Sequence, residues 1–468
     1  MQRLITKYGL AAHLAFLAVA PLFLFPFYGE GTIATVLLWL SLLAALWTVL
    51  EPSMLSGESL SGSRRRVVGG ILADPLFWVL LILTVFSGLR ALNTGIALSY
   101  NAETAVWYVS SQPISLLPGA VVGTGYLPFA VAVSFLVLVQ GCRHSIGRAA
   151  RHFFLLLSSA LAGLASVVFL LALRLGGFEG VHALLPPSEG VGCSSFVGVV
   201  FGLYLMGGAV ALVAIFEQGW NRALAAAILA IGGTAAGVIA FSPSYVLIAL
   251  AAAGLLALVY ALAFSGKAFQ SSGLFRIVLS AVAALVLGIL FVAMVLPREV
   301  FAERLSAFAE LRIFPERFWK LREVLSVIAF KSWVSELWLG TGLSSFPLDF
   351  RVNAQASDWE LFPRGVTAIA NGWWLLLAER GVIGFVLFAF PAVLLSVTWI
   401  CRLIGGVSSL ELPHPACLLA PLAFALFVAD GFFDCSMLRA DVLLATGALV
   451  SISAASFPRL RRGRDVRR

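Results

Sequence analysis

Long apolar stretches separated by short polar ones fill most of the chain, and they predict membrane-spanning helices. A helix needs about 20 predominantly apolar residues to cross a bilayer. Stretches of this kind occur at residues 9–28, 32–50, 75–92, 125–142, 152–174, 193–216, 222–241, 244–264, 275–297, 381–401, 413–431 and 439–457. The pattern therefore predicts an all-α polytopic membrane protein with about 12 transmembrane helices, the first of them retained rather than cleaved as a signal peptide.

One polar interruption is long enough to fold by itself. Residues 298–371, between the ninth and tenth predicted spans, combine equal numbers of basic and acidic residues with helical patterning and with Trp319, Trp333, Trp338 and Trp359. Aromatic and cationic residues on such helices suit the membrane–water interface. We predict transmembrane helices 1–9 in residues 1–297, a long helical periplasmic loop or cap in 298–371, helices 10–12 in 372–457 and a basic cytoplasmic tail in 458–468.

Composition supports the membrane assignment. Hydrophobic residues make up 61% of the 468 positions and charged residues 12%, and the mean hydropathy is +1.00. A soluble domain is about half apolar and a quarter charged. A water-soluble fold with so few charges could not cover its apolar surface, so the lipid bilayer is the predicted surrounding.

The net charge of +8 does not indicate a nucleic-acid partner, because the basic residues occur in short runs between apolar stretches. Cytoplasmic loops are enriched in Lys and Arg. With twelve spans these runs all fall on one side, at residues 3–7, 64–66, 143–148, 267 and 458–468. Both termini are therefore predicted to be cytoplasmic, and the weakly charged segment 93–124 is predicted to lie along the outer interface.

The sequence contains few candidates for catalytic chemistry inside the membrane. The five cysteines are widely spaced without metal-ligand spacing, and they are predicted to be small buried hydrophobic residues. No phosphate-binding glycine loop, HExxH motif or nucleophile elbow is present. The ionisable residues near predicted span ends are expected to extend their side chains toward water: Arg90, Arg174, Asp430, Asp434 and Asp441.

The predicted cap contains a cluster of basic residues: Arg304, Arg312, Arg317, Lys320 and Arg322. The guanidinium group of an arginine can bind two phosphate oxygens at once, so the cluster could hold a lipid diphosphate. The alternative is that the cluster pairs with the interleaved carboxylates Glu310, Glu316 and Glu323 and forms a solvated surface. Spacing alone favours this second interpretation.

The second half of the chain resembles a known family. The stretch GTGLSSF (340–346) is followed, after a variable segment, by NGWWLLLAERGVIGF (371–385). Over residues 185–455 this arrangement resembles the O-antigen ligase/polymerase family of integral membrane glycosyltransferases. The matching positions are Arg317 with Leu321 and Leu325, then Gly340, Gly342, Phe346, Asn371, Leu375, Leu376, Glu379, Gly381, Gly384 and Asp434.

The resemblance implies a function at the outer face of the bacterial inner membrane. Enzymes of this family transfer a glycan from an undecaprenyl-diphosphate carrier to an acceptor glycan or lipid, without a metal or other cofactor. The substrate-binding residues would be Arg304, Arg312, Arg317, Arg322, Arg364, Asn371 and Glu379. The structural residues would be Gly340, Gly342, Phe346, Gly381, Gly384 and Asp434.

The chain departs from the family pattern at two places. The family's histidine beside Asn371 is Ala370 here, and its Ser-Arg-Gly turn is Ser242-Pro243-Ser244. Alanine cannot accept a proton, and losing a general base typically costs about 10²–10⁴-fold in rate. Either the chemistry has changed, or the protein is a non-catalytic relative, or another side chain substitutes, such as His182, Glu360 or Arg364.

Two other classes of function remain open at this point. A carrier or flippase for lipid-linked or small solutes also suits about twelve spans, and it predicts broken helices and polar residues at the membrane midplane. A non-catalytic partner in envelope polysaccharide assembly predicts a cavity without a complete set of charges. The large predicted cap favours the enzyme, whereas the missing histidine favours another function.

Overall fold

The computed structural model describes most of the chain. The described residues are 2–24, 28–50, 67–101, 106–111, 120–121, 125–184, 196–217, 221–242, 246–255, 271–299, 301–302, 316–362, 366, 369, 371–408 and 415–456.

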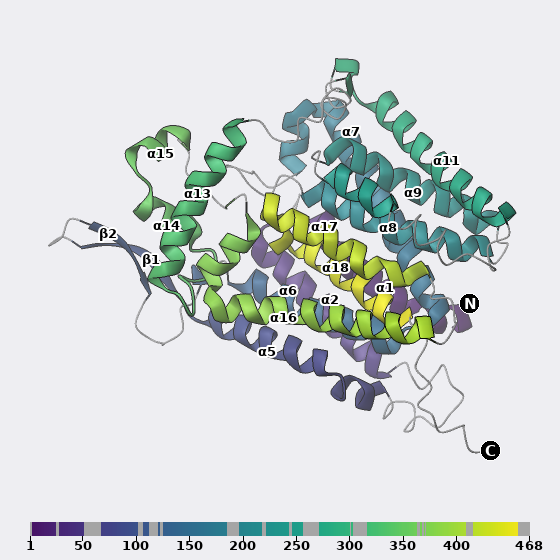
Figure 1. The fold of residues 1–468 in the computed structure, drawn as a ribbon, viewed down its shortest axis with the longest axis horizontal. Coiled ribbons are helices and arrows are strands. Elements are labelled where there is room, and N and C mark those ends of the chain that lie inside the picture. Colours follow the sequence, from purple (N-terminus) through teal and green to yellow (C-terminus); the bar gives the residue numbers. More distant parts are fainter. Residues whose placement is uncertain are drawn as a thin grey trace.

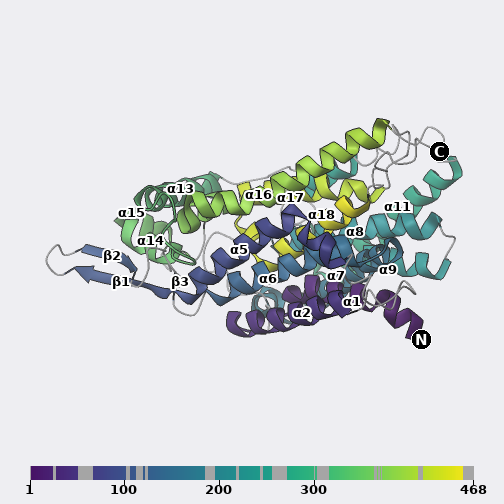
Figure 2. The ribbon, with the colours of Figure 1, turned by 90° about the horizontal axis from the view of Figure 1, so that it is seen from below.

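The body of the molecule is a bundle of long helices packed side by side at different tilts (Figures 1 and 2). They are α1 (Gln2–Leu24), α2 (Glu30–Leu50), α5 (Pro75–Leu92), α6 (Tyr126–Gln140), α7 (Arg148–Leu184), α8 (Phe196–Glu217), α9 (Asn221–Phe241), α11 (Ser271–Val295), α16 (Gly372–Ser408), α17 (Leu419–Phe433) and α18 (Ala440–Ser456). A large apolar core of buried residues joins most of these helices.

Within the described residues, nine helices are long and apolar enough to cross a membrane. Three shorter apolar helices, Tyr8–Leu24, Val246–Leu255 and Ala440–Ser456, lie at the first, eighth and twelfth predicted spans. Large apolar side chains face outward on many of them, including Trp39, which is 61% exposed, and Met294, which is 77% exposed. A bundle that is apolar both inside and outside suits a lipid surrounding. The chain is a polytopic membrane protein.

Small residues bring three of these helices into close contact. A Cβ atom on Gly233 of α9 would lie 2.9 Å from the Cα of Gly163 of α7. On the other side of α9, a Cβ on Gly288 of α11 would lie 3.0 Å from the carbonyl oxygen of Gly232. Helices in lipid commonly associate through such close backbone contacts, because the burial of apolar surface there contributes little free energy to association.

A group of short helices covers one end of the bundle, which we call the cap end. The cap consists of α13 (Glu316–Ser335), α14 (Phe346–Asn353) and α15 (Ala356–Leu361), and it lies opposite the N-terminal end of α1 (Figure 1). It has its own apolar cluster, built around Leu325, Phe346 and Phe350. The described part of 298–371 is therefore a folded unit that packs against the first half of α16.

A small sheet, which the sequence did not predict, also lies at the cap end of this predominantly helical structure. Strands β1 (Thr94–Asn101), β2 (Val106–Ser111) and β3 (Ala120–Val121) pair in the order β2-β1-β3, with β1 and β2 antiparallel and Tyr100 opposite Trp107. The β1–β2 hairpin extends beyond the helices (Figure 2), whereas the sequence predicts that it lies along the interface. Its Ile, Val, Tyr and Trp residues suit strands, but they resemble an apolar interfacial segment in composition.

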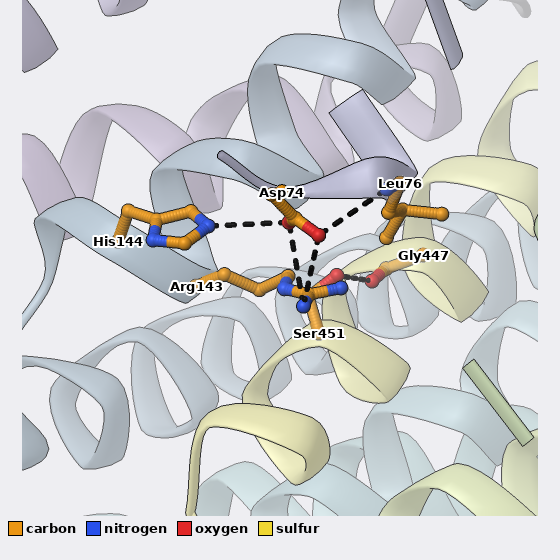
Figure 3. Close-up of polar contacts among 6 residues, drawn as sticks. All are labelled: Asp74, Leu76, Arg143, His144, Gly447 and Ser451. Atoms are coloured by element: carbon orange, nitrogen blue, oxygen red, sulfur yellow. Dashed lines mark hydrogen bonds and ion pairs between the residues drawn. The ribbon is translucent and has the colours of Figure 1, made fainter. Parts of the chain in front are cut away.

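The opposite end of the bundle is held by a polar cluster around Asp74 (Figure 3). The carboxylate of Asp74 caps α5 by accepting from the amide of Leu76 at 3.2 Å. It also pairs with Arg143 at 3.3 Å and with His144 at 3.2 Å, both in the π-helical turn Gly141–Ser145 that ends α6. Burial raises the pKa of Asp74, but the His144 hydrogen bond and the Arg143 charge outweigh it and lower the pKa overall.

Candidate functional site

Helix α16 is broken at the cap end by Gly381, whose φ of 63° and ψ of −171° are not helical. A break leaves backbone amides and carbonyls without helical partners, and these must be bonded elsewhere. The turn that follows α13 supplies the partners, through four bonds of 2.9–3.1 Å: Thr341 N to Ala378 O, Gly342 N to Glu379 O, Val382 N to Leu337 O and Ile383 N to Trp338 O.

Glycine is required on both sides of this junction. We call residues 340–346 the glycine turn; within it Gly340 has φ 68° and Gly342 has φ 126°. A Cβ atom on Gly381 would lie 2.4 Å from the carbonyl of Trp338, and one on Gly340 would lie 2.5 Å from the amide nitrogen of Arg380. The glycine turn and the break in α16 therefore lock together through their backbones.

The Gly381→Ala substitution is expected to destabilise the protein strongly. The φ and ψ of Gly381 lie in a region that is essentially restricted to glycine and costs other residues about 1–3 kcal/mol, and the overlap with Trp338 adds to this. Thermal unfolding in detergent should show a clear loss. Gly147→Ala is the control, because no atom lies within 4 Å of a Cβ built there. Equal unfolding midpoints for the two variants would contradict this view of the junction.

Glu379 and Arg90 connect the junction to neighbouring elements. The side chain of Glu379 accepts from the amide of Phe346 at 3.5 Å, and its carbonyl accepts from the guanidinium of Arg90 on α5 at 2.9 Å. Arg90 is 0% exposed and lies over the ring of Phe86 at 5.5 Å. The expectation that Arg90 extends toward water is therefore wrong: its side chain fixes α5 to the broken helix.

A buried carboxylate lies beneath the glycine turn. Asp349 of α14 is 3% exposed, and one of its oxygens accepts from the hydroxyls of Thr341 at 2.7 Å and Ser345 at 3.3 Å. Burial raises the pKa of Asp349 to about 6, although both hydroxyl hydrogen bonds act in the opposite direction.

This burial predicts a defined pH dependence for stability. The pKa of Asp349 is about 6 in the folded protein against 3.8 for the free side chain. Folding therefore favours the protonated form of Asp349. The stabilisation of the folded protein that results is fully present below pH 4 and is lost as pH rises through 6. The difference amounts to about 3 kcal/mol. Asp349→Asn should remove this dependence, so that the variant gains stability relative to the wild type between pH 4 and 7.

Thermal unfolding measured across this pH range is the test. Glu336→Gln, an exposed carboxylate of the cap end, is the matched control and should follow the wild-type curve. Parallel curves for the wild type and Asp349→Asn would show that the Asp349 carboxyl does not titrate as its surroundings imply.

A cavity of about 410 Å³ lies beside the junction, between α5, α6, α16, α17 and α18. This volume is within the usual range for small-molecule sites. Most of the lining is apolar, with Leu83, Val131, Phe135, Phe388 and Val450 among the contributing residues. Along α18, the lining runs from Arg439, the residue before the helix, to Val450, which corresponds to a depth of roughly 16 Å at 1.5 Å per helical residue.

The polar groups of the cavity are concentrated at the cap end. Arg380 follows Glu379 at the break in α16, Arg439 precedes α18, and Glu30 begins α2. Asp441, which is 1% exposed, accepts from Nε of Arg439 at 3.4 Å and fixes the direction of that guanidinium. Ser344 of the glycine turn also lines this end, and it has a positive φ of 59°. A strained non-glycine residue at a cavity wall is a feature of functional sites.

One wall of the cavity reaches the outer surface of the bundle. Val393 of α16 and Val428 of α17 line the cavity and are also 53% and 40% exposed. These residues lie within segments long and apolar enough to cross a membrane. The exposed side of this wall would therefore face lipid chains rather than water.

The structure places the residues predicted from the sequence in several different surroundings. Arg322 lies 5.7 Å from the ring of Trp319 and 5.6 Å from that of Phe433, and it is not among the residues that line the cavity. Asn371 caps α16, because its side-chain oxygen accepts from the amides of Trp373 and Trp374 at 3.1 and 3.2 Å.

Asp434, Phe346 and Gly384, which the sequence predicts to be structural, all have structural contacts or buried positions. The carbonyl of Asp434 accepts from the amide of Gly372 at 2.9 Å, which joins the end of α17 to the start of α16. Phe346 is 0% exposed in the cap cluster, and Gly384 is buried in α16. Arg317 lies in α13, but its side chain is outside the described part, as are residues Arg304, Arg312, Arg364 and Ala370 altogether.

The cysteines differ from the prediction that all five are simply small buried hydrophobic residues. Cys142 and Cys417 are buried, Cys401 is exposed, and none of these three is disulfide-bonded. Cys435, which lines the cap end of the cavity, is disulfide-bonded, and its partner lies outside the described residues. Among the residues that the structure describes, no three His, Cys, Asp or Glu side chains come together as a metal site.

The sequence draws attention to the cap arginines but not to the charges that line the cavity. Arg380 lies between Glu379 and Gly381, the Glu-x-Gly block that matches the family pattern, so the sequence indicated this position. Glu30 and Arg439 lie at helix ends and belong to no motif. No protein-family model matches the chain, and no curated protein is similar enough to match it.

Proposed function

We propose that this protein transfers a glycan from an undecaprenyl-diphosphate carrier to an acceptor at the outer face of a bacterial inner membrane. The observation that carries the proposal is the cavity, whose apolar interior ends in Arg380 and Arg439. A lipid-linked donor has the matching structure: a long apolar chain, a diphosphate and a sugar. The cavity would hold part of the chain and place the diphosphate beside the two guanidinium groups.

The depth and the exposed wall of the cavity support a lipid ligand. The lining extends roughly 16 Å along α18, about half the thickness of a bilayer core. A carrier lipid could enter sideways past Val393 and Val428, because its chain would pass from one apolar surrounding to another. A water-soluble substrate would gain nothing from so long an apolar wall.

The two arginines supply the electrostatics that such a reaction needs. Negative charge develops on the diphosphate as its bond to the sugar breaks, and fixed cations lower the energy of that transition state. Asp441 orients Arg439, and the backbone lock of the glycine turn positions Arg380. Of the residues by which the sequence resembles the O-antigen ligase/polymerase family, Leu375 lines the cavity, and Glu379 and Gly381 flank Arg380 in the chain.

Two independent features favour an outward orientation of the cap end. With the three shorter apolar helices taken as crossings, twelve spans put the basic loops and both termini on the cytoplasmic side. The disulfide at Cys435 lies at the cap end, and disulfides persist in oxidising compartments such as the periplasm. The cavity would then open in the outer half of the membrane.

One observation favours a carrier instead, namely that α16 is a broken helix. Carriers place such breaks near the membrane midplane. Here the break is level with the end of α5, because Arg90 lies two residues before that end and bonds to Glu379. We infer that the break shapes the cap end of an enzyme site rather than a transport path through the midplane.

Deletion of the gene in its source organism tests the proposal. Lipid-linked glycan should accumulate in the outer leaflet, where a membrane-impermeant oxidant such as periodate reaches it in spheroplasts. The wild-type gene should clear it. A flippase defect would instead leave the glycan in the inner leaflet, protected from periodate. That protected pattern, or no accumulation at all, would overturn the proposed function.

A further inference from the structure

Glu30 is the only carboxylate among the described residues that line the cavity. It begins α2, where its side chain is exposed at the cap end. The other lining residues with polar side chains are two arginines, hydroxyl residues and a tryptophan. Among the described residues, Glu30 is therefore the carboxylate available to take up a proton inside this cavity.

Nearby carboxylates are engaged with protein groups instead. Asp441 pairs with Arg439 and accepts from the amide of Val442 at 3.0 Å. The Glu379 side chain accepts from the amide of Phe346 on the glycine turn, and Asp434 accepts from the amide of Cys435 at 2.7 Å. These three acids hold the walls of the site in place.

The position of Glu30 relative to the arginines suits a base. Glu30 interacts electrostatically with Arg439, which also lines the cavity and immediately precedes α18. A diphosphate bound by Arg380 and Arg439 would place the anomeric carbon of its sugar at the cap end. An acceptor hydroxyl approaching that carbon from the aqueous side would pass the carboxylate of Glu30.

We propose that Glu30 is the catalytic base that activates the acceptor hydroxyl, and this inference rests on the proposed function. The hydroxyl proton moves to a Glu30 oxygen as the hydroxyl oxygen bonds to the anomeric carbon. The bond between that carbon and the diphosphate oxygen breaks, and its electron pair stays on the diphosphate. Arg380 and Arg439 neutralise the new charge, and Glu30 then releases its proton to water.

This assignment provides the general base that the alanine at position 370 cannot supply. Two merely structural roles are the competing explanations for Glu30. It could act as a counter-ion for Arg439, or as an acidic residue that stabilises the N-terminus of α2. Both would act on lipid binding or on folding, not on the transfer step alone.

The test uses full-length protein in nanodiscs with lipid-linked glycan extracted from the deletion strain and an acceptor fraction from the same cells. Glu30→Gln should lower the transfer rate by about 10²–10⁴-fold while binding of polyprenyl phosphate stays within about twofold. Glu30→Ala should be slow as well, and added formate should restore part of its rate by replacing the missing base. The surface variant Glu336→Gln should behave as the wild type.

Each other outcome rejects the assignment. A Glu30→Gln rate close to that of the wild type would show that the proton goes elsewhere. Loss of polyprenyl phosphate binding in Glu30→Gln, or no formate rescue of Glu30→Ala, would make Glu30 a structural residue. If the wild type itself neither binds the lipid nor transfers glycan, the proposed function fails first, and the role of Glu30 fails with it.

Discussion

Arg380→Gln is expected to lower the rate of glycan transfer by about 10²–10³-fold, the usual cost of losing one group that stabilises developing charge in a transition state. Glutamine keeps most of the side chain's length and polarity but cannot neutralise the diphosphate. Arg380→Lys keeps the charge without the planar fork that binds two phosphate oxygens at once, so its rate should fall between those of Arg380→Gln and the wild type.

Initial rates with the extracted lipid-linked glycan measure this effect in nanodiscs. Lys331→Gln on α13 is the matched control, because it also removes one positive charge from the cap end but is exposed and does not line the cavity. Unchanged unfolding midpoints for all variants would establish that the rates report chemistry. If Lys331→Gln and Arg380→Gln lost activity equally, net charge rather than the Arg380 guanidinium would be responsible.

Ala392→Trp is expected to prevent the lipid chain from entering the cavity. Ala392 lines the cavity on α16 beyond the break, at a depth where no charged residue contributes to the lining. An indole there would displace about four methylenes of a bound chain, each worth about 0.8 kcal/mol. Affinity for polyprenyl phosphate should therefore fall by about 10²-fold.

Val386→Trp provides the control for this substitution. Val386 lies on the same helix, is 52% exposed and is not among the residues that line the cavity. The same large side chain would there extend into lipid and leave polyprenyl phosphate binding unchanged. Equal affinities for the two tryptophan variants would mean that the chain does not occupy the cavity.

The membrane-spanning part of the fold follows closely from hydropathy. Each of the nine long apolar helices, and each of the three shorter ones, lies at a stretch that the apolar pattern identifies. The pattern is reliable because a span must satisfy its own backbone in lipid, which leaves a helix as the available form. The small sheet was not predictable in this way, because residues 94–101 carry the same apolar composition as an interfacial segment.

Hydropathy also misjudges Arg90. A charged residue near the end of an apolar stretch can extend to water or turn inward to a partner, and the one-dimensional pattern is the same in both cases. The partner of Arg90 is the carbonyl of Glu379, which is available only because Gly381 breaks α16. The sequence shows the glycine but not the three-dimensional junction that uses it.

The site itself was only partly predictable. The glycine turn and the Glu-x-Gly block identify the correct end of α16, but charge density in the cap favoured Arg317 and Arg322 over Arg380 and Arg439. The cavity is assembled from helices that are distant in the sequence, so no local window contains its charges. Only the packing of α2, α16 and α18 brings Glu30, Arg380 and Arg439 to one cavity.

The decisive measurement is the binding of polyprenyl phosphate to the purified protein, followed by native mass spectrometry with phosphatidylglycerol as the competing lipid. The wild type should retain polyprenyl phosphate in preference to the phospholipid, and Arg380→Gln, Arg439→Gln and Ala392→Trp should each lose it. If all three variants retained it as well as the wild type does, the cavity and its two arginines would not be the site for a lipid phosphate.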